Sequence, residues 1–144
     1  MKRTAWISTE PIDLPAMFSS VSAPAHGAVA SFVGQVRDHD PEAKGEVVAL
    51  RYTCHPDAQR FIEEIVERTV TEHDPQGVTD VSATHRIGDL DVGDLALVVV
   101  VGSAHRDLAF TLCRTVVEAI KFELPVWKQQ FEASGTHVWS GLNC

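Results

Sequence analysis

The run from Leu95 to Val101 constrains the fold of this chain more than any other segment. All of its residues are apolar, and it ends in four consecutive valines. Valine is stiff at χ1 and favours extended backbone, and an apolar run without polar alternation indicates a strand that is covered on both faces. We therefore expect this run to be a central, buried strand of a sheet.

Two longer segments have the periodicity of amphipathic helices. From Pro56 to Val70, apolar residues recur at helical spacing and charged residues take the other face, and Pro75-Gln76-Gly77 ends this helix. A second helix is predicted from about Arg106 to Phe122, with Pro125 ending or interrupting it.

Shorter elements complete the predicted order. Capping and proline signals at Ser8-Thr9-Glu10-Pro11 indicate a helix running to about Val21, and Trp127 to about Ala133 could form a short final helix. The segments 38–45 and 88–94 are predicted to be a mobile loop and a turn. Strands are expected at Arg3–Ser8, Ala28–Val36, Val47–Thr53, Val78–Ile87 and His137–Trp139. Because strands and helices alternate irregularly, we expect an α+β fold in one domain spanning residues 1–144.

The charge of the chain narrows the functions open to it. The formal net charge is −8, with 12 Lys and Arg against 20 Asp and Glu, and a negative surface disfavours nucleic-acid binding. An anion site would have to be a local cluster of basic residues. No segment has the length of a membrane span, and the basic N-terminus lacks the apolar run of a signal peptide. We expect a cytoplasmic protein that does not bind a membrane.

The cysteines and histidines indicate no metal site and no disulfide framework. The three cysteines, Cys54, Cys113 and Cys144, form no CxxC pair, and the histidines lack metal-ligand spacing. Cys113 falls on the inward face of its predicted helix, which indicates a core residue. Cys54 beside His55 leaves open a thiol nucleophile, although such a dyad needs proximity in space rather than in sequence.

Three basic residues stand at the ends of predicted elements. Arg37 ends a strand where a loop begins. His105 and Arg106 lie between the buried strand and a helix, where free backbone N–H groups and the positive end of the helix dipole favour an anion. A His-Arg pair adds charge-assisted donors suited to phosphate. The alternative is that Arg106 stands at the start of the helix without binding an anion.

Lys121 and Lys128 both have apolar neighbours in the sequence. They are 128 − 121 = 7 residues apart, but Pro125 between them removes the argument that they share one helix face. A lysine that is partly desolvated or close to another cation can act as a base or a nucleophile. The alternative is that each lysine lays its stem on apolar surface and keeps its ammonium group in water.

Several short motifs stand in a fixed order along almost the whole chain, from about Gly27 to Trp139. Each is weak alone, and their order makes the set specific. They are Gly27-Ala28, Phe32-Val33-Gly34-Gln35-Val36-Arg37, Leu50 with Tyr52, His85-Arg86-Ile87-Gly88-Asp89-Leu90 with Gly93-Asp94, Ser103-Ala104-His105-Arg106 with Ala109-Phe110, and Lys121-Phe122-Glu123-Leu124-Pro125-Val126-Trp127-Lys128. With these motifs the chain closely resembles the molybdopterin synthase large-subunit family.

The resemblance implies an α/β-hammerhead type of fold with a mixed, mainly antiparallel sheet, and a central homodimer. Each end of the dimer would bind a small ubiquitin-like sulfur carrier, giving a heterotetramer. The carrier's C-terminal Gly-Gly tail, activated as a thiocarboxylate, would enter a pocket. The implied activity is that of a sulfurtransferase in molybdenum cofactor biosynthesis, which converts cyclic pyranopterin monophosphate (precursor Z) into the dithiolene of molybdopterin. The pterin is the substrate, and no cofactor is expected because the sulfur arrives activated.

The resemblance also assigns the site residues. Lys121 and Lys128 match the family's active-site lysines, and Arg37, His105 and Arg106 match its pterin- and phosphate-binding residues. In the family the His-Arg pair reaches the site across the dimer interface. Our hypothesis is that Lys121 is the principal acid/base, or the electrostatic stabiliser of acyl transfer. Lys128 would then anchor the substrate and the tail carboxylate.

Two positions depart from the family's pattern. Thr53 lies in a stretch where the family commonly has glutamate, and Gln130 stands where the family commonly has the glutamate of Trp-Lys-x-Glu. Both changes remove carboxylates expected near the pocket or the carrier surface. They leave open a non-catalytic paralogue that binds the carrier without efficient chemistry.

Overall fold

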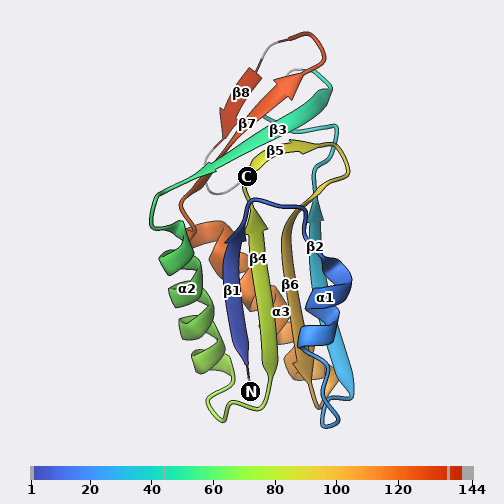
Figure 1. Ribbon diagram of the computed structural model, residues 1–144, viewed down its shortest axis with the longest axis vertical. Helices are drawn as coiled ribbons and strands as arrows, with labels where there is room; N and C mark the ends of the chain where they lie inside the picture. The colour runs from blue at the N-terminus through green and yellow to red at the C-terminus, as the bar shows by residue number, and fades with distance from the viewer. Residues whose placement is uncertain (1, 44, 136, 141–144) are drawn as a thin grey trace.

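The computed structural model describes residues 2–43, 45–135 and 137–140, which form two four-stranded sheets. The first sheet has the strand order β1 (Arg3–Ser8), β4 (Asp80–Arg86), β6 (Leu95–Ser103), β2 (Ala28–Gln35). The second has the order β5 (Gly88–Asp91), β3 (Val47–Cys54), β7 (Val126–Glu132), β8 (His137–Ser140). The second sheet lies across one end of the first (Figure 1).

The strand pairing confirms the expected α+β fold with mixed, mainly antiparallel pairing. β1 and β4 run parallel, and the other strand pairs of the described residues are antiparallel. β6 lies between β4 and β2, and its residues Val98–Val101 are wholly buried. The apolar run of the sequence is therefore the central strand it was expected to be.

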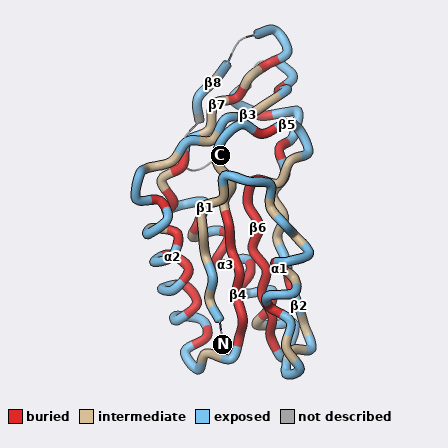
Figure 2. The backbone as a smooth tube through the Cα atoms, viewed as in Figure 1, coloured by how far each residue is buried: buried red, intermediate tan, exposed pale blue. Residues whose placement is uncertain are grey.

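Alternate side chains of β6 point to opposite faces of the sheet, and each face has its own helical cover. Val99 and Val101 pack in one core with α2 (Ala58–His73) and α3 (Arg106–Glu123). Val98 and Val100 pack on the other face with Met17 of α1 (Leu14–Ser20). Figure 2 shows the buried residues along β4 and β6 and on one side of α2. None of the described helices is long and apolar enough to cross a membrane.

Three element predictions need correction. The first helix begins at Leu14 rather than near Pro11, because the Asp13 carboxylate accepts a hydrogen bond from the Ala16 N–H (3.1 Å) and caps it there. The segment 88–94 is only partly a turn, because Gly88–Asp91 forms β5 against β3. The final helix predicted from Trp127 is wrong. That segment belongs to β7, which pairs with both β3 and β8.

Candidate functional site

A pocket lies where the two sheets meet, beside the C-terminal end of α3. An inner cavity of about 90 Å³ shares several lining residues with an outer groove of about 300 Å³. The first sheet contributes the ends of β2 and β4 and the start of β6, and the second sheet contributes β3 and β7. The residues that line both parts are Gly34, Gln35, Tyr52, Lys121 and Lys128.

Lys121 and Lys128 reach this pocket from different kinds of element. Lys121 stands in the last turn of α3, where a cation is favoured by the helix dipole. The helix ends at Glu123, and the chain passes through Leu124 and Pro125 into β7, which carries Lys128 opposite Tyr52 of β3. The structure therefore brings the two lysines into one pocket, although they lie on different elements and their spacing in the sequence does not predict this.

Lys128 forms an ion pair inside the pocket wall. Its Nζ donates to Oδ2 of Asp40 at 3.0 Å, and the two side chains are only 11% and 10% exposed. Burial alone would raise the pKa of Asp40, but hydrogen bonds from the Glu42 N–H, Lys128 and Gln130 outweigh it and hold that pKa below its usual value. Asp40 therefore stays ionised at neutral pH, and it is a site residue that sequence reasoning missed.

The loop that carries Asp40 is attached to β7 at a second place. The Gly45 N–H donates to Oε1 of Glu132 at 2.5 Å, and the Ala133 N–H donates to the Glu46 carbonyl at 2.9 Å. Because Lys128, Gln130 and Glu132 alternate along β7, they share its inward face. The segment predicted to be a mobile loop is thus hydrogen-bonded to the strand that carries Lys128.

His85 lines the inner cavity next to Lys121. Its Nδ1 lies 2.8 Å from the Arg86 carbonyl oxygen, which can only accept, so Nδ1 carries the proton and Nε2 keeps its lone pair. Burial lowers the pKa of His85 to about 4, the hydrogen bond to Arg86 opposes this, and the charge of Lys121 lowers the pKa further. His85 is therefore neutral at physiological pH and close to a lysine ammonium group.

Arg37 and the His105-Arg106 pair occupy different parts of the molecule. Arg37 lines the outer groove together with both lysines. His105 is the N-cap of α3 and Arg106 its first residue, so about 15 helical residues, or roughly 22 Å, separate Arg106 from Lys121. A single chain therefore does not bring this pair to the pocket.

The two departures from the family's pattern lie in different environments. Thr53 is exposed and pairs with Trp127 on the outward face of the second sheet, whereas its neighbour Tyr52 lines the pocket. Gln130 is 1% exposed, lines the outer groove and hydrogen-bonds to Asp40. The pocket consequently holds a carboxylate beside Lys128 although position 130 is an amide.

The cysteines do not form a thiol site in the described residues. Burial raises the pKa of the Cys54 thiol, and Nδ1 of His55 accepts a hydrogen bond from the Asp57 N–H at 3.0 Å. Cys113 is buried, its pKa is raised by burial to about 11, and its Sγ contacts the Val99 carbonyl, in agreement with the predicted core role. Cys144 lies outside the described residues.

The described His, Cys, Asp and Glu residues do not form a group of three or more that could hold a metal ion.

The sequence of this chain matches a known protein family. Residues 7–123 match the family model of the MoaE protein. The chain belongs to the MoaE family. Molybdopterin synthase catalytic subunit 1 of Mycobacterium tuberculosis, a MoaE relative, is 35% identical over 136 residues, which cover 94% of this chain and 88% of that protein. The family expected from the ordered motifs is therefore confirmed, and it is the family of molybdopterin synthase catalytic subunits.

The fold of this MoaE chain is also found in solved structures. Molybdopterin synthase from Staphylococcus aureus superposes with a TM-score of 0.81 at 27% identity, covering 94% of this chain and 96% of that one. One chain in the complex of subunits 1 and 2 of molybdopterin-converting factor from Helicobacter pylori shares the fold with a TM-score of 0.73 at 20% identity, covering 94% of this chain and 89% of that one. The expected hammerhead-type fold is confirmed by these matches.

Proposed function

We propose that this MoaE chain transfers sulfur from a thiocarboxylated ubiquitin-like carrier to cyclic pyranopterin monophosphate, forming the dithiolene of molybdopterin. The observation that carries the proposal is the meeting of Lys121 and Lys128, from a helix and a strand, in one pocket with Arg37 at its outer part. In a chain of net charge −8, this cluster is a local site for an anionic substrate.

The environments of the two lysines support different roles. Lys128 Nζ lies 3.0 Å from the Asp40 carboxylate, which holds it at one point of the pocket wall, so it is suited to binding the substrate or the tail carboxylate. Lys121 lies close to the neutral imidazole of His85, whose Nε2 lone pair can accept a hydrogen bond. The thiocarboxylate sulfur would first displace an oxygen of the pterin side chain, which leaves the carrier joined to the substrate as a thioester. Water then adds to the acyl carbon and forms a tetrahedral oxyanion, whose collapse breaks the acyl C–S bond and leaves the sulfur on the pterin and a carboxylate on the carrier. We assign Lys121 to the acid/base step or to stabilising that oxyanion.

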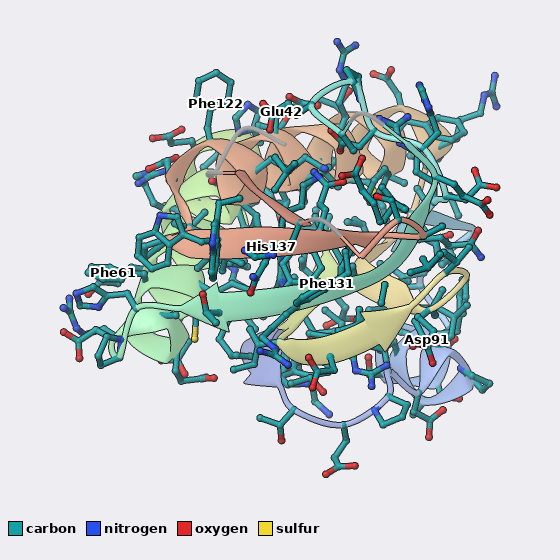
Figure 3. All side chains as sticks on the ribbon, turned by 90° about the horizontal axis from the view of Figure 1, so that it is seen from above. Glu42, Phe61, Asp91, Phe122, Phe131 and His137 are labelled. Carbon is teal, nitrogen blue, oxygen red and sulfur yellow. The ribbon has the colours of Figure 1, made fainter. Side chains whose placement is uncertain are left out.

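The shape of the pocket and the surface beside it suit a carrier protein. A Gly-Gly tail has no side chains, so it can enter a narrow groove that leads to an inner cavity of about 90 Å³. Phe122 follows Lys121 and Trp127 precedes Lys128, and they are 67% and 41% exposed. Figure 3 shows Phe122 projecting from the rim of the molecule. Exposed aromatic residues next to a site are typical of a docking surface, and the H. pylori relative is a complex of two subunits.

A homodimer would complete the site. His105 and Arg106 lie at the opposite end of α3 from Lys121, so they can serve a pocket only if they belong to a second protomer. β2 is an edge strand, and the exposed Phe110 of α3 stands beside it in a groove that also includes Phe32. This surface suits a second copy of the chain. With two carriers the assembly becomes a heterotetramer, and the reaction needs no redox cofactor because the sulfur arrives activated.

The proposal is tested by mixing the purified chain with a thiocarboxylated carrier and cyclic pyranopterin monophosphate, then measuring the dithiolene pterin. We expect product with the wild type and almost none with Lys121→Ala, while carrier binding is unchanged. Lys2→Ala is the matched control, because it is the same substitution at an exposed residue of the N-terminal segment. Near-normal turnover by Lys121→Ala contradicts the assignment of Lys121.

Wild-type carrier binding without product would instead favour the non-catalytic paralogue. In that case Gln130→Glu is the first reversion to test, because Gln130 lines the groove, and Thr53→Glu is the second, because Thr53 faces away from it. If neither carrier binding nor product is observed, the proposed function itself is wrong.

A further inference from the structure

Asp40 contacts the pocket through its side chain and holds its own loop through the same carboxylate. Its Oδ1 accepts the Glu42 N–H at 2.9 Å, and its Oδ2 accepts Lys128 Nζ at 3.0 Å. The carboxylate also accepts a hydrogen bond from the Gln130 side chain. Each of its oxygens is therefore engaged, and one of them joins the loop to a site lysine.

The ion pair is shielded from water, which gives it more weight than a surface salt bridge. Both side chains are about nine-tenths buried, and Gln130 beneath them is wholly buried. A buried pair in good geometry is held firmly, and removal of one partner leaves the other charge uncompensated. By contrast, the ion pair between Arg60 and Glu64 has both side chains more than half exposed, so it is expected to contribute little to stability.

A long lysine side chain has many rotamers, so its ammonium group needs a partner if it is to stay at one point of a pocket. Val126 and Gln130, the neighbours of Lys128 on the inward face of β7, are both buried, so the Lys128 stem leaves a packed part of the strand. Asp40 is the residue that fixes the ammonium group. It comes from a loop that is itself hydrogen-bonded to Glu132 of the same strand.

We propose that Asp40 is a positioning residue of this site, which holds the Lys128 ammonium group in place and makes its loop part of the substrate-binding wall. This inference rests on the proposed function for its kinetic consequence, but the pairing itself can be tested without any turnover. Asp40 acts through Lys128 and is not assigned contact with the substrate.

The decisive variant is Asp40→Asn, because its remaining oxygen can still accept the Glu42 N–H, whereas the charge and the acceptor that face Lys128 are both lost. Asp38→Asn is the matched control, the same change two residues earlier at an exposed side chain. In Asp40→Asn/Gln130→Glu the acid and the amide exchange places, and the carboxylate returns beside Lys128 from the other partner of the existing hydrogen bond.

In the sulfur-transfer assay we expect Asp40→Asn to raise the KM for the pterin by about tenfold or more, because the lysine is no longer held at its binding position. The double variant should recover most of this loss, and Asp38→Asn should match the wild type. Damage to folding lowers the active fraction and hence kcat, and leaves the KM unchanged. An unchanged KM in Asp40→Asn, or a double variant no better than the single one, overturns the proposal.

A second measurement separates failure of this inference from failure of the proposed function. Acetic anhydride acetylates a lysine amine that it can reach, so the buried ion pair with Asp40 should slow its reaction with Lys128. Mass spectrometry of the Lys128 peptide reports this reactivity at neutral pH. We expect Asp40→Asn to increase this labelling severalfold, the double variant to reverse the increase, and Asp38→Asn to have no effect. If the wild type makes no product and these labelling changes still occur, the pairing stands and the sulfur-transfer function fails. Equal labelling in all four proteins refutes the pairing.

Discussion

The rings of His85 and Tyr52 meet edge to face, with centroids 4.9 Å apart and an interplanar angle of 79°, at the junction of the two sheets. The contact fixes a neutral imidazole from the first sheet against an aromatic ring from the second. Both residues line the inner cavity. The protonation of His85 is therefore coupled to the packing that forms the pocket.

This coupling predicts a specific loss of stability in mild acid. The pKa of His85 is about 4 in the folded chain and 6.5 when unperturbed. Between these values the unfolded chain binds a proton that the folded chain does not, so the free energy of unfolding falls as the pH falls, by up to about 3 kcal/mol. Urea unfolding between pH 7 and pH 4 should show this slope in the wild type and a smaller one in His85→Phe, which keeps an aromatic ring.

The buried carboxylates do not account for a loss of stability between pH 6.5 and pH 4. Asp40, Asp74 and Asp80 have lowered pKa values in the folded chain, so their stabilising contribution is lost only as the pH falls below their ordinary value near 3.8. Parallel slopes for the wild type and His85→Phe between pH 6.5 and pH 4 would mean that His85 is charged in the folded protein.

The separation of Arg106 from Lys121 predicts complementation between two inactive variants. If each pocket takes Lys121 from one protomer and Arg106 from the other, a mixed dimer of Lys121→Ala and Arg106→Ala has one intact pocket. After equal mixing and subunit exchange, turnover should recover to about one quarter of the wild-type value, since half of the dimers are mixed and each has one of two sites.

The control for this experiment is a mixture of Lys121→Ala with Lys128→Ala. These two residues line the same pocket of one chain, so every pocket of a mixed dimer lacks one of the two lysines and no turnover should be recovered. Recovery in neither mixture, with subunit exchange verified, would show that Arg106 does not act across an interface.

Cys54 is predicted to be dispensable for turnover. Burial raises the pKa of its thiol, so little thiolate exists at neutral pH, and His55 uses Nδ1 at the start of α2. Cys54→Ser should keep most of the wild-type rate in the sulfur-transfer assay, and iodoacetamide should inhibit the wild type no more than it inhibits this variant. A loss as severe as that of Lys121→Ala would favour a thiol enzyme.

Asp74 is predicted to be important for stability rather than for chemistry. It follows α2, is 2% exposed, and accepts hydrogen bonds from the Val78 N–H (3.0 Å), the Thr79 N–H (3.0 Å) and the Thr79 hydroxyl (2.6 Å). Asp74→Ala leaves these donors without an acceptor and should lower the free energy of unfolding by about 2–4 kcal/mol at pH 7. Urea unfolding measures this directly, and Asp89→Ala on the surface serves as the control. A change below about 1 kcal/mol would contradict the role.

The parts of the fold predicted correctly were those whose residues repeat a hydrophobic pattern. The strand that begins at Leu95 buries both faces, and the helices that begin at Ala58 and Arg106 each bury one. Each of these patterns of burial corresponds to a pattern of apolar residues in the sequence. β7 was predicted as a helix because its inward positions are occupied by Lys128, Gln130 and Glu132. A strand whose buried side is polar carries no alternating apolar signal, and here the polar side forms the pocket wall.

The site was predictable only as far as its motifs extended. Lys121 and Lys128 were assigned by resemblance, and the structure brings both to one pocket. Asp40 had no such signal, because its role depends on a loop closing onto a strand 88 residues away. The neutral state of His85 likewise depends on burial between two sheets, which local sequence does not reveal.

The short connection between α3 and β7 determines which side chains of β7 face the pocket. Leu124 and Pro125 alone separate the helix that ends after Lys121 from the strand that carries Lys128. Side chains of a strand alternate between its faces, so one residue inserted after Pro125 would shift the parity of β7 if the strand kept its hydrogen-bonded position. Lys128 and Gln130 would then point to solvent, and Trp127 would point inward. The site therefore depends on the length of this two-residue junction as much as on the identity of its lysines.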